Sequence, residues 1–383
     1  MKKYLLSAAL MALFAVGFTA SEGDLVDENL VVDPTKIPSD DLANPNPAVP
    51  NPTTSIPNIQ TTFSQEGDVL VLRIDMTGVK NQQDYDWLKL YGTGLTNQNV
   101  WVEIDGKPKG IEVINLGEEE SSEVMTDIVF IVDNSGSMDA EADKIANDIV
   151  AWAQLLASSN LNARFGVVGY DGTISGALNM TDIEGLKTFL DYYYGTYRTY
   201  HFGGEDAEDL KAKAPNYFLN YYSDECGGAA IQYANEYFAF RTGANRIYVN
   251  FTDEPNSPCG HDNCSVEYYK DQKNWAAAQG TVHTIFSEDP SWYTWSSYYE
   301  KPWLISEYTG GTTQFIRSDA SDLDLTKILV TQAMQNSYII RLKNIADLIN
   351  DGLEHEIHIT INYVDKNGNV TSADKTFIVK FEK

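Results

Sequence analysis

The chain has 383 residues, of which 55 are acidic and 27 basic, so its formal net charge is −28 at pH 7. This balance argues against nucleic acid or an anionic membrane as a partner, and it favours cations. With 23 Tyr, 15 Phe and 7 Trp, the sequence can build more than one hydrophobic core.

Residues 1–21 have the features of a cleaved export signal. Lys2 and Lys3 precede the uncharged apolar run from Tyr4 to Phe18, and the small residues Thr19-Ala20-Ser21 follow it. The run is too short for a comfortable membrane span, and an uncleaved N-terminal anchor is the alternative. We therefore expect an exported protein, either secreted or held at the cell surface, whose mature chain has no integral membrane span.

Residues 22–58 are rich in Pro and Asn. They contain few large apolar side chains and two clusters of turn-forming residues, at 44–47 and 51–54. Such a composition cannot bury enough surface to fold, so we expect a disordered linker here.

The regions 59–120 and 337–383 both show the two-residue period of strands. In the first, we expect strands at 69–76, 100–104 and 110–114. In the second, we expect strands at 337–342, 355–364 and 376–381. Neither region alone has enough strands to bury both faces of a sheet. We expect the two regions to pair as one antiparallel β-sandwich that is split in sequence; two unrelated β-modules are the alternative.

Between these regions, residues 124–335 alternate between strands and helices. The apolar run 127–132 is typical of a strand buried on both faces, and residues 142–156 have apolar side chains at helical spacing. Further strands are expected at 164–170, 246–252, 281–286 and 312–316. The alternation predicts an α/β fold, a doubly wound parallel sheet with flanking helices, inserted in the split β-sandwich.

Oxygen-bearing side chains follow the first strand of this middle region. Asp133, Ser135 and Ser137 are spaced by two, so in an extended loop their oxygens face one side. A second strand ends at Asp253, and in an open parallel sheet ligands collect at the carboxyl ends of the strands. Carboxylates and hydroxyls suit Mg²⁺, Mn²⁺ or Ca²⁺ and are poor ligands for zinc or copper. A turn that caps a helix is the plainer explanation of the Asp-x-Ser-x-Ser pattern.

The order of these features resembles the von Willebrand factor type A family, which includes the inserted domains of integrins. The resemblance covers roughly residues 124–335: the apolar strand, Asp-x-Ser-x-Ser, an amphipathic helix, and the strand that ends in Thr252-Asp253. It implies that Asp133, Ser135, Ser137 and Asp253 form a metal-ion-dependent adhesion site. It also implies that the site recognises a partner, often one whose acidic group completes the coordination of the ion.

A fifth metal ligand is undecided. Many members of the family supply a threonine from the loop between the two halves, and Thr199 is the candidate here, with Thr196 nearby. The segment 203–209 instead resembles a loop of integrin β subunits, in which Asp209 would take the position of the metal-binding glutamate. An acidic helix N-terminus explains the same segment without a metal.

Aromatic loops are expected around this site. The residues that would form a rim for a ligand are Tyr197, Tyr200, Trp292 and Trp295. Tyrosine and tryptophan supply contact area at low entropic cost, although local packing of long loops is the alternative.

The three cysteines are Cys226, Cys259 and Cys264. In an oxidising compartment Cys259 and Cys264 could form a disulfide, although the pairing among three thiols cannot be decided from sequence. A zinc site that also uses His261 and Asp262 is the alternative, but the spacing matches no recognised finger pattern.

Taken together, these features predict an extracellular, metal-dependent binding or adhesion protein with a protein or glycan partner. A structural protein of surface assembly, whose metal only stabilises the fold, is the main alternative. A hydrolase is the third, but no nucleophile elbow or phosphate-binding loop occurs. His355 and His358 are spaced by three on an expected strand, so their side chains leave opposite faces. We therefore do not expect an enzyme.

Overall fold

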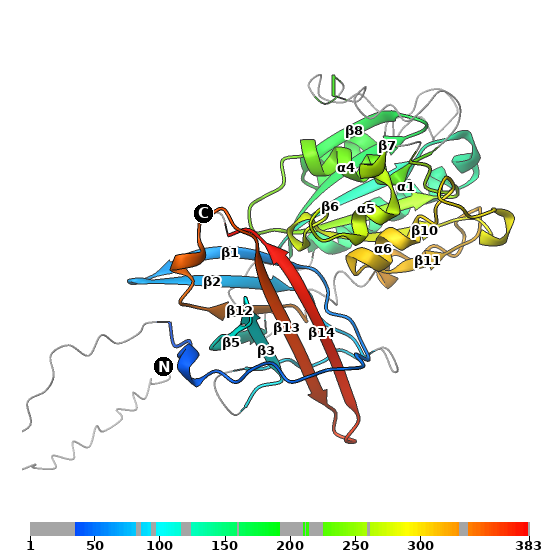
Figure 1. Ribbon diagram of the computed structural model, residues 1–383. Coiled ribbons are helices and arrows are strands. Elements are labelled where there is room, and N and C mark those ends of the chain that lie inside the picture. Colours follow the sequence, from blue (N-terminus) through cyan, green and yellow to red (C-terminus); the bar gives the residue numbers. More distant parts are fainter. Residues whose placement is uncertain are drawn as a thin grey trace, which may run out of the picture.

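The computed structural model describes residues 35–81, 86–92, 97–115, 124–158, 161–191, 210, 212–213, 225–258, 261–328 and 336–381. Figure 1 shows a part in which helices cover a six-stranded sheet, and a second part built from two four-stranded sheets. No helix in the described ranges is long and apolar enough to cross a membrane.

A six-stranded sheet forms the centre of the first part, in the order β11-β10-β9-β6-β7-β8. All neighbours are parallel except β8, which is antiparallel to β7. The strands are β6 (Val124–Asp133), β7 (Leu161–Tyr170), β8 (Ile174–Thr181), β9 (Asn245–Thr252), β10 (Thr281–Phe286) and β11 (Thr313–Phe315). The predicted α/β sheet is therefore present, and it is consistent with a von Willebrand factor A-like fold.

The antiparallel strand β8 has no counterpart in the sequence prediction. It contains Gly176, Ala177 and Asn179, which are poor strand formers, so its sequence lacks the usual signal. Its backbone pairing with β7, after a short turn, supplies the stability that its composition does not.

Helices cover both faces of the six-stranded sheet. α1 (Ala142–Ser158) and α2 (Ile183–Leu190) share one buried cluster with Ile128, Phe130 and Val132 of β6. α4 (Gly227–Tyr237), α5 (Val266–Lys270) and α6 (Trp303–Thr309) share the other with Val129 and Ile131. β6 thus sends alternate side chains to two apolar faces, which explains its continuous apolar sequence.

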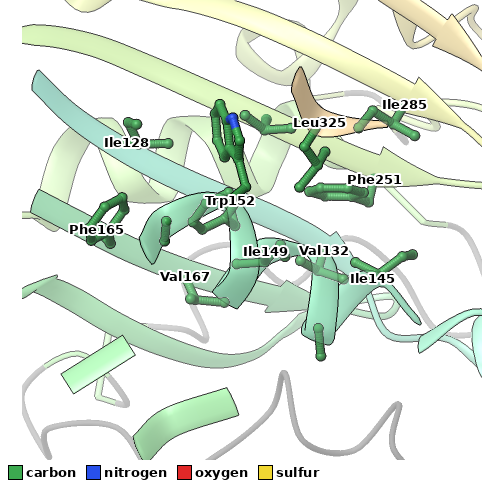
Figure 2. Close-up of a cluster of buried hydrophobic side chains, with 14 of the residues drawn as sticks. Ile128, Val132, Ile145, Ile149, Trp152, Phe165, Val167, Phe251, Ile285 and Leu325 are labelled. Carbon is green, nitrogen blue, oxygen red and sulfur yellow. The ribbon is translucent and has the colours of Figure 1, made fainter. Parts of the chain in front are cut away.

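The core under α1 is built around Trp152. Figure 2 shows its indole among side chains of the sheet, including Ile128 and Phe251. The ring lies edge-on to Phe130, with 6.0 Å between ring centroids, and only 3% of the residue is exposed. This packing fixes α1, and with it the loop that connects β6 to α1.

The remaining strands form two antiparallel sheets, β1-β2-β12-β5 and β14-β13-β3-β4. They are β1 (Ile59–Glu66), β2 (Val69–Met76), β3 (Val100–Ile104), β4 (Lys107–Pro108), β5 (Ile111–Asn115), β12 (Tyr338–Leu342), β13 (His355–Val364) and β14 (Val370–Val379). Each sheet joins strands from before and after the six-stranded sheet. Ile340 of β12 pairs with Ile74 of β2 and Val113 of β5, and Ile359 of β13 pairs with Val102 of β3. Side chains of both sheets contribute to one buried cluster.

Part of the expected disordered linker packs against these sheets. From residue 35 onward the chain is described, with Ile37 and Ile56 buried. Asn46 donates hydrogen bonds to the backbone oxygen of His358 (3.1 Å) and to Thr360 Oγ1 (3.0 Å). A backbone oxygen and a hydroxyl of β13 therefore hold a segment whose own composition gives no signal for order, and packing on the strands replaces an internal core.

Short 3-10 helices lie in the connections. They are η1 (Asp40–Leu42), η2 (Gly136–Ala140), η5 (Asp262–Cys264), η6 (Ala277–Gln279), η7 (Pro290–Trp292), η8 (Leu325–Lys327) and η9 (Ala346–Leu348).

The two parts of the molecule meet where β9 and β10 begin. The amide of Asn58 donates to the backbone oxygen of Gly280 (2.9 Å), and that of Gln60 donates to Ala278 (2.8 Å). A cavity of about 290 Å³ lies at this junction, lined by both parts. Because parallel strands that begin at the junction end at the opposite edge, the carboxyl ends of β6 and β9 point away from the four-stranded sheets.

Candidate metal centre

Three neighbouring parallel strands end together at the edge of the sheet that lies away from the junction. β6 lies between β9 and β7, and it ends at Asp133. β7 ends at Tyr170, the register partner of Asp133, and β9 ends at Thr252. The loops that follow β6 and β9 therefore start side by side, as the convergence of Asp133 and Asp253 requires.

The structure brings the four sequence-predicted residues together in one chain of hydrogen bonds. The backbone N–H of Ser135 donates to Asp133 Oδ1 (2.9 Å). The hydroxyls of Ser135 and Ser137 share a hydrogen bond of 2.9 Å, and Ser137 Oγ donates to Asp253 Oδ1 (3.1 Å). Thr252, which the sequence analysis did not single out as a ligand, donates its hydroxyl to Asp133 Oδ2 (3.0 Å).

Both carboxylates of this site are buried. Asp133 has no exposed surface and Asp253 is 7% exposed. Burial raises the pKa of Asp133 to about 7, and the nearby charge of Asp253 adds to the rise. Burial also raises the pKa of Asp253, against the hydrogen bond from Ser137. Two carboxylates held this close in a poorly solvated place favour a bound cation, because each carries a charge that water does not stabilise.

Two further buried carboxyl groups interact electrostatically with the pair. Glu141, at the end of the loop before α1, is 1% exposed and accepts a hydrogen bond from Ser287. Burial raises its pKa to about 8, with added repulsion from Asp253 and Asp133. Glu225 precedes α4, and burial followed by the charge of Asp133 raises its pKa to about 9. The centre is therefore strongly negative in potential when its carboxyl groups are ionised.

A second layer of polar contacts fixes the loops that carry these groups. The backbone N–H of Asn134 donates to the Tyr170 carbonyl (2.8 Å), and the Ser175 hydroxyl donates to Asn134 Oδ1 (2.9 Å). The Tyr170 hydroxyl donates to Asn250 Oδ1 (3.2 Å). The loop after β6 is thus tied to β7 and β8 before any ion binds.

The donor set fits a hard divalent cation. It combines two carboxylates with serine and threonine hydroxyls, which are the oxygen ligands that Mg²⁺, Mn²⁺ and Ca²⁺ prefer. Among the described residues no three His, Cys, Asp or Glu side chains converge as a metal cluster, so the hydroxyls are essential to such a centre. None of the ion pairs between described residues involves Asp133 or Asp253.

The loop after β10 lies beside this centre. The Tyr293 hydroxyl donates to the backbone oxygen of Asp253 (2.7 Å). Trp292 is 73% exposed, and Tyr298 and Tyr299 are 45% and 43% exposed. Trp295, also expected in the rim, is half-buried and packs edge-on against Trp303 with 5.0 Å between centroids. Trp292 is therefore the more accessible of the two tryptophans, and the role of both in a rim stays a prediction.

Several predicted residues lie outside the part of the chain that the structure describes. They are Tyr197, Thr199, Tyr200, Asp209 and Cys259. The fifth metal ligand and the Tyr-rich side of the rim therefore stay predictions.

The zinc alternative for the cysteine-containing loop has no support among the residues described. His261 and Asp262 are exposed, whereas Cys264 is buried and faces away from solvent. The two histidines of β13 are also absent from the centre. Nδ1 of His355 lies 2.8 Å from Asp105, and Nε2 of His358 lies 2.8 Å from Asp374, both within the four-stranded sheets.

Comparison with known proteins gives only distant similarity. No protein-family model and no curated protein matches the chain. The conserved hypothetical protein BatB from Bacteroides thetaiotaomicron is 18% identical, over 55% of this chain and 97% of BatB, with a TM-score of 0.35. The pilus adhesin SpaC from Lactobacillus rhamnosus GG is 9% identical, over 83% of this chain and 55% of SpaC, with a TM-score of 0.39. Proximal thread matrix protein 1 from the mussel byssus is 14% identical, over 60% of this chain and 49% of that one, with a TM-score of 0.33. The structure of that protein has a zinc-occupied metal-ion-dependent adhesion motif. Because all three TM-scores are below 0.5, these similarities carry no argument about function.

Proposed function

We propose that this chain is an exported binding protein that recognises its partner through a divalent cation held by Asp133, Ser135, Ser137 and Asp253. The observation that carries the proposal is the buried pair of carboxylates, linked by hydroxyl hydrogen bonds at the carboxyl ends of parallel strands. No described basic side chain neutralises this pair. A cation is the group that would satisfy both carboxylates at once.

The roles of the residues follow from their positions. Asp133 and Asp253 would supply the charge, and the two serine hydroxyls would add neutral oxygen ligands. Thr252 would orient Asp133, because its hydroxyl donates to a carboxylate oxygen of that residue. The bound ion, Mg²⁺ or else Mn²⁺ or Ca²⁺, would act as a Lewis acid that accepts an oxygen ligand from outside the protein. Ser137 is exposed, which leaves the ion approachable from that side.

The partner would meet the ion beside an aromatic surface. Trp292, Tyr298 and Tyr299 are exposed on a loop that is tied to Asp253 through Tyr293. Exposed aromatic side chains around a charged centre favour recognition of a protein surface, and a glycan is the second choice. An acidic group on the partner would complete the coordination of the ion.

The α/β domain would be inserted in a second domain. The four-stranded sheets would form one β-sandwich, split in sequence, into which the α/β domain is inserted, with boundaries near residues 124 and 335. Cross-pairing of β12 and β13 with strands from the N-terminal region supports this. Export, by the signal expected at residues 1–21, would display the metal centre on the side of the molecule away from the sandwich.

A structural role for the metal is the second candidate. Glu141 and Asp133 both have pKa values raised by burial, so an ion would relieve repulsion whether or not a partner binds. In that case the chain would be a component of surface assembly, and the ion would stabilise its fold. Neither candidate involves catalysis.

A binding screen with and without chelator separates these candidates. The mature chain, Asp133→Ala and the matched control Asp139→Ala would be tested against extracellular proteins and glycans. Asp139 is an exposed carboxylate in η2, so the control removes the same charge close to the site. Recognition of a partner that is lost in chelator and in Asp133→Ala alone supports metal-dependent binding. Partner binding that survives both changes contradicts it, and a change confined to the melting temperature favours the structural role.

A further inference from the structure

Two buried cysteines lie close together in the hydrophobic cluster that contains α4 and α5. Cys226 immediately precedes α4 and has no exposed surface, and Cys264 ends η5 and is 3% exposed. The Cys226 Sγ lies 3.9 Å from the backbone oxygen of Cys264 and 3.2 Å from Asn256 Oδ1. Both side chains belong to the same buried cluster, so these thiols share one environment although they are far apart in sequence.

The backbones that carry the two thiols are also in close contact. A Cβ at Gly228 would lie 2.2 Å from the Cys264 carbonyl oxygen, so only glycine permits this approach. Asn256 joins the two segments by hydrogen bonds, because its Oδ1 accepts from the Gly228 N–H (2.9 Å) and its Nδ2 donates to the Cys264 carbonyl (3.1 Å). A disulfide needs two backbones held at short range, and this contact holds them there, with the Cys226 sulfur close to the backbone of Cys264 and the Cys264 sulfur 3.5 Å from Asn263 Oδ1.

We propose that Cys226 and Cys264 form a disulfide in the exported protein, which leaves Cys259 as the free thiol. The oxidant is an external disulfide, either a small-molecule disulfide or that of an exported thiol oxidoreductase. One cysteine thiolate attacks this disulfide to form a mixed disulfide and releases one thiolate. The second cysteine then displaces the other thiolate and forms the intramolecular bond. The two protons lost by the cysteines are taken up by the two released thiolates, so the reaction balances.

The burial of both sulfurs sets the time at which the bond forms. Burial raises the pKa of the Cys226 thiol, and the neighbouring Cys264 side chain raises it further. A folded, reduced protein would therefore hold few thiolates and react slowly. The bond forms while the chain folds after export, and it then resists reductants that cannot enter the core.

The bond would connect two elements that border the metal centre. Cys226 follows Glu225, whose backbone oxygen accepts a hydrogen bond from Ser257 N–H (3.0 Å). Cys264 lies on the same long loop as Asp253, which follows β9. The cross-link would thus fix the loop after β9 to the start of α4, and it would restrict the unfolded chain by closing a loop of 38 residues.

Mass spectrometry of a non-reduced digest tests the assignment directly. Trypsin leaves Cys259 and Cys264 together on the peptide from Ile247 to Lys270, so a second cut before Asp262 is needed to separate them. The full chain, expressed for export to an oxidising compartment and alkylated under denaturing conditions, should give a cross-link between the peptides that contain Cys226 and Cys264. Cys259 should carry the alkyl group. A Cys259–Cys264 link, a Cys226–Cys259 link or three alkylated cysteines overturns the proposal.

A stability measurement provides the second test. Cys226→Ser and Cys264→Ser should each lower the melting temperature by about 5–10 °C, and the matched control Cys259→Ser should leave it unchanged. A buried Cys→Ser change also loses packing, so reduced wild type is the second comparison. The melting temperature of wild type that is unfolded, reduced and refolded with reductant should fall by a similar amount. Equal melting temperatures of the reduced and oxidised wild type contradict the cross-link. Neither test requires a metal ion, so this proposal can fail while the proposed function stands.

Discussion

Replacing Asp133 by Asn should stabilise the metal-free protein above pH 7 and abolish its stabilisation by Mg²⁺. Burial, together with the charge of Asp253, raises the pKa of Asp133 from 3.8 to about 7. A raised pKa means that the folded state holds the proton more tightly than the unfolded chain does. The buried carboxyl therefore does not destabilise the fold below pH 3.8, and its destabilising effect grows as the pH rises through about 7.

The change in stability on replacing Asp133 follows from the difference between its pKa in the unfolded and folded states. A pKa that rises from 3.8 to about 7 corresponds to about 4 kcal/mol of lost stability at pH 8. Asparagine has one acceptor oxygen, so it keeps only one of the two hydrogen bonds that Ser135 and Thr252 donate to the carboxylate, and this loss subtracts about 1–2 kcal/mol. Metal-free Asp133→Asn should therefore be about 2 kcal/mol more stable than wild type at pH 8, and no more stable than wild type at pH 4. Mg²⁺ at a hundred times its Kd should add about 2.7 kcal/mol to wild type and nothing to the variant.

The assay is urea unfolding, followed by tryptophan fluorescence, at both pH values with chelator or with Mg²⁺. Asp139→Asn, which changes an exposed carboxylate, is the matched control and should behave as wild type. Two results would refute the reasoning: a metal-free Asp133→Asn that is less stable than wild type at pH 8, or equal stabilisation of both proteins by Mg²⁺.

Other substitutions test separate parts of the account. Thr252→Val removes the hydroxyl that donates to Asp133 Oδ2 and should weaken Mg²⁺ binding by about 10–100-fold in calorimetric titration. An unchanged Kd for Mg²⁺ would mean that Thr252 does not orient Asp133. Trp292 is 73% exposed, so Trp292→Ala should change the free energy of unfolding by less than about 0.5 kcal/mol and yet weaken partner binding. An unchanged Kd for the partner would show that Trp292 is not part of the interface. Burial lowers the pKa of His355, but hydrogen bonds to Asp105 and Asp351 outweigh this effect, so the pKa lies above 6.5. Protonated His355 therefore stabilises the fold below pH 6.5, and this stabilisation is lost as the pH rises through the folded-state pKa. His355→Gln should therefore destabilise more at pH 5 than at pH 8, by about 1 kcal/mol, and equal losses at both pH values count against the ion pairs. Trp152→Ala should lower the free energy of unfolding by about 3–5 kcal/mol in urea titration, and a loss below 1 kcal/mol would be inconsistent with the core in Figure 2.

Local sequence is sufficient to place the residues of the candidate metal centre that stand at the ends of strands. Asp133 and Asp253 are recognisable because each stands at or just beyond the end of an apolar strand, and parallel strands end at one edge. The two glycines before β11 are required by the geometry of the turn. Gly310 has φ 81° at the end of α6, and a Cβ at Gly311 would lie 1.7 Å from the Val282 carbonyl oxygen. Both positions require glycine, so the pattern in the sequence reflects geometry directly.

Features that depend on tertiary packing were not predictable. Glu141 reads as an ordinary acidic residue at a helix start, and only its burial against Ser287 reveals its place beside the centre. Thr252 stands at the end of an expected strand, but its hydrogen bond to Asp133 requires the ends of β6 and β9 to be in register. The edge-on contact of Trp295 with Trp303 also depends on the position of α6, and the sequence gives no signal for it because loop aromatics look alike. The order of residues 35–58 likewise comes from the strands they cover.

The central claim is that a divalent cation binds between Asp133, Ser135, Ser137 and Asp253. Crystals grown with Mn²⁺ test it most directly, because the anomalous signal locates the ion independently of the protein atoms. We predict one strong peak about 2.0–2.5 Å from the oxygens of Asp133 and the two serines, which disappears in Asp133→Ala. An absence of density at this position in millimolar Mn²⁺, or a peak that persists in the variant, would contradict the account.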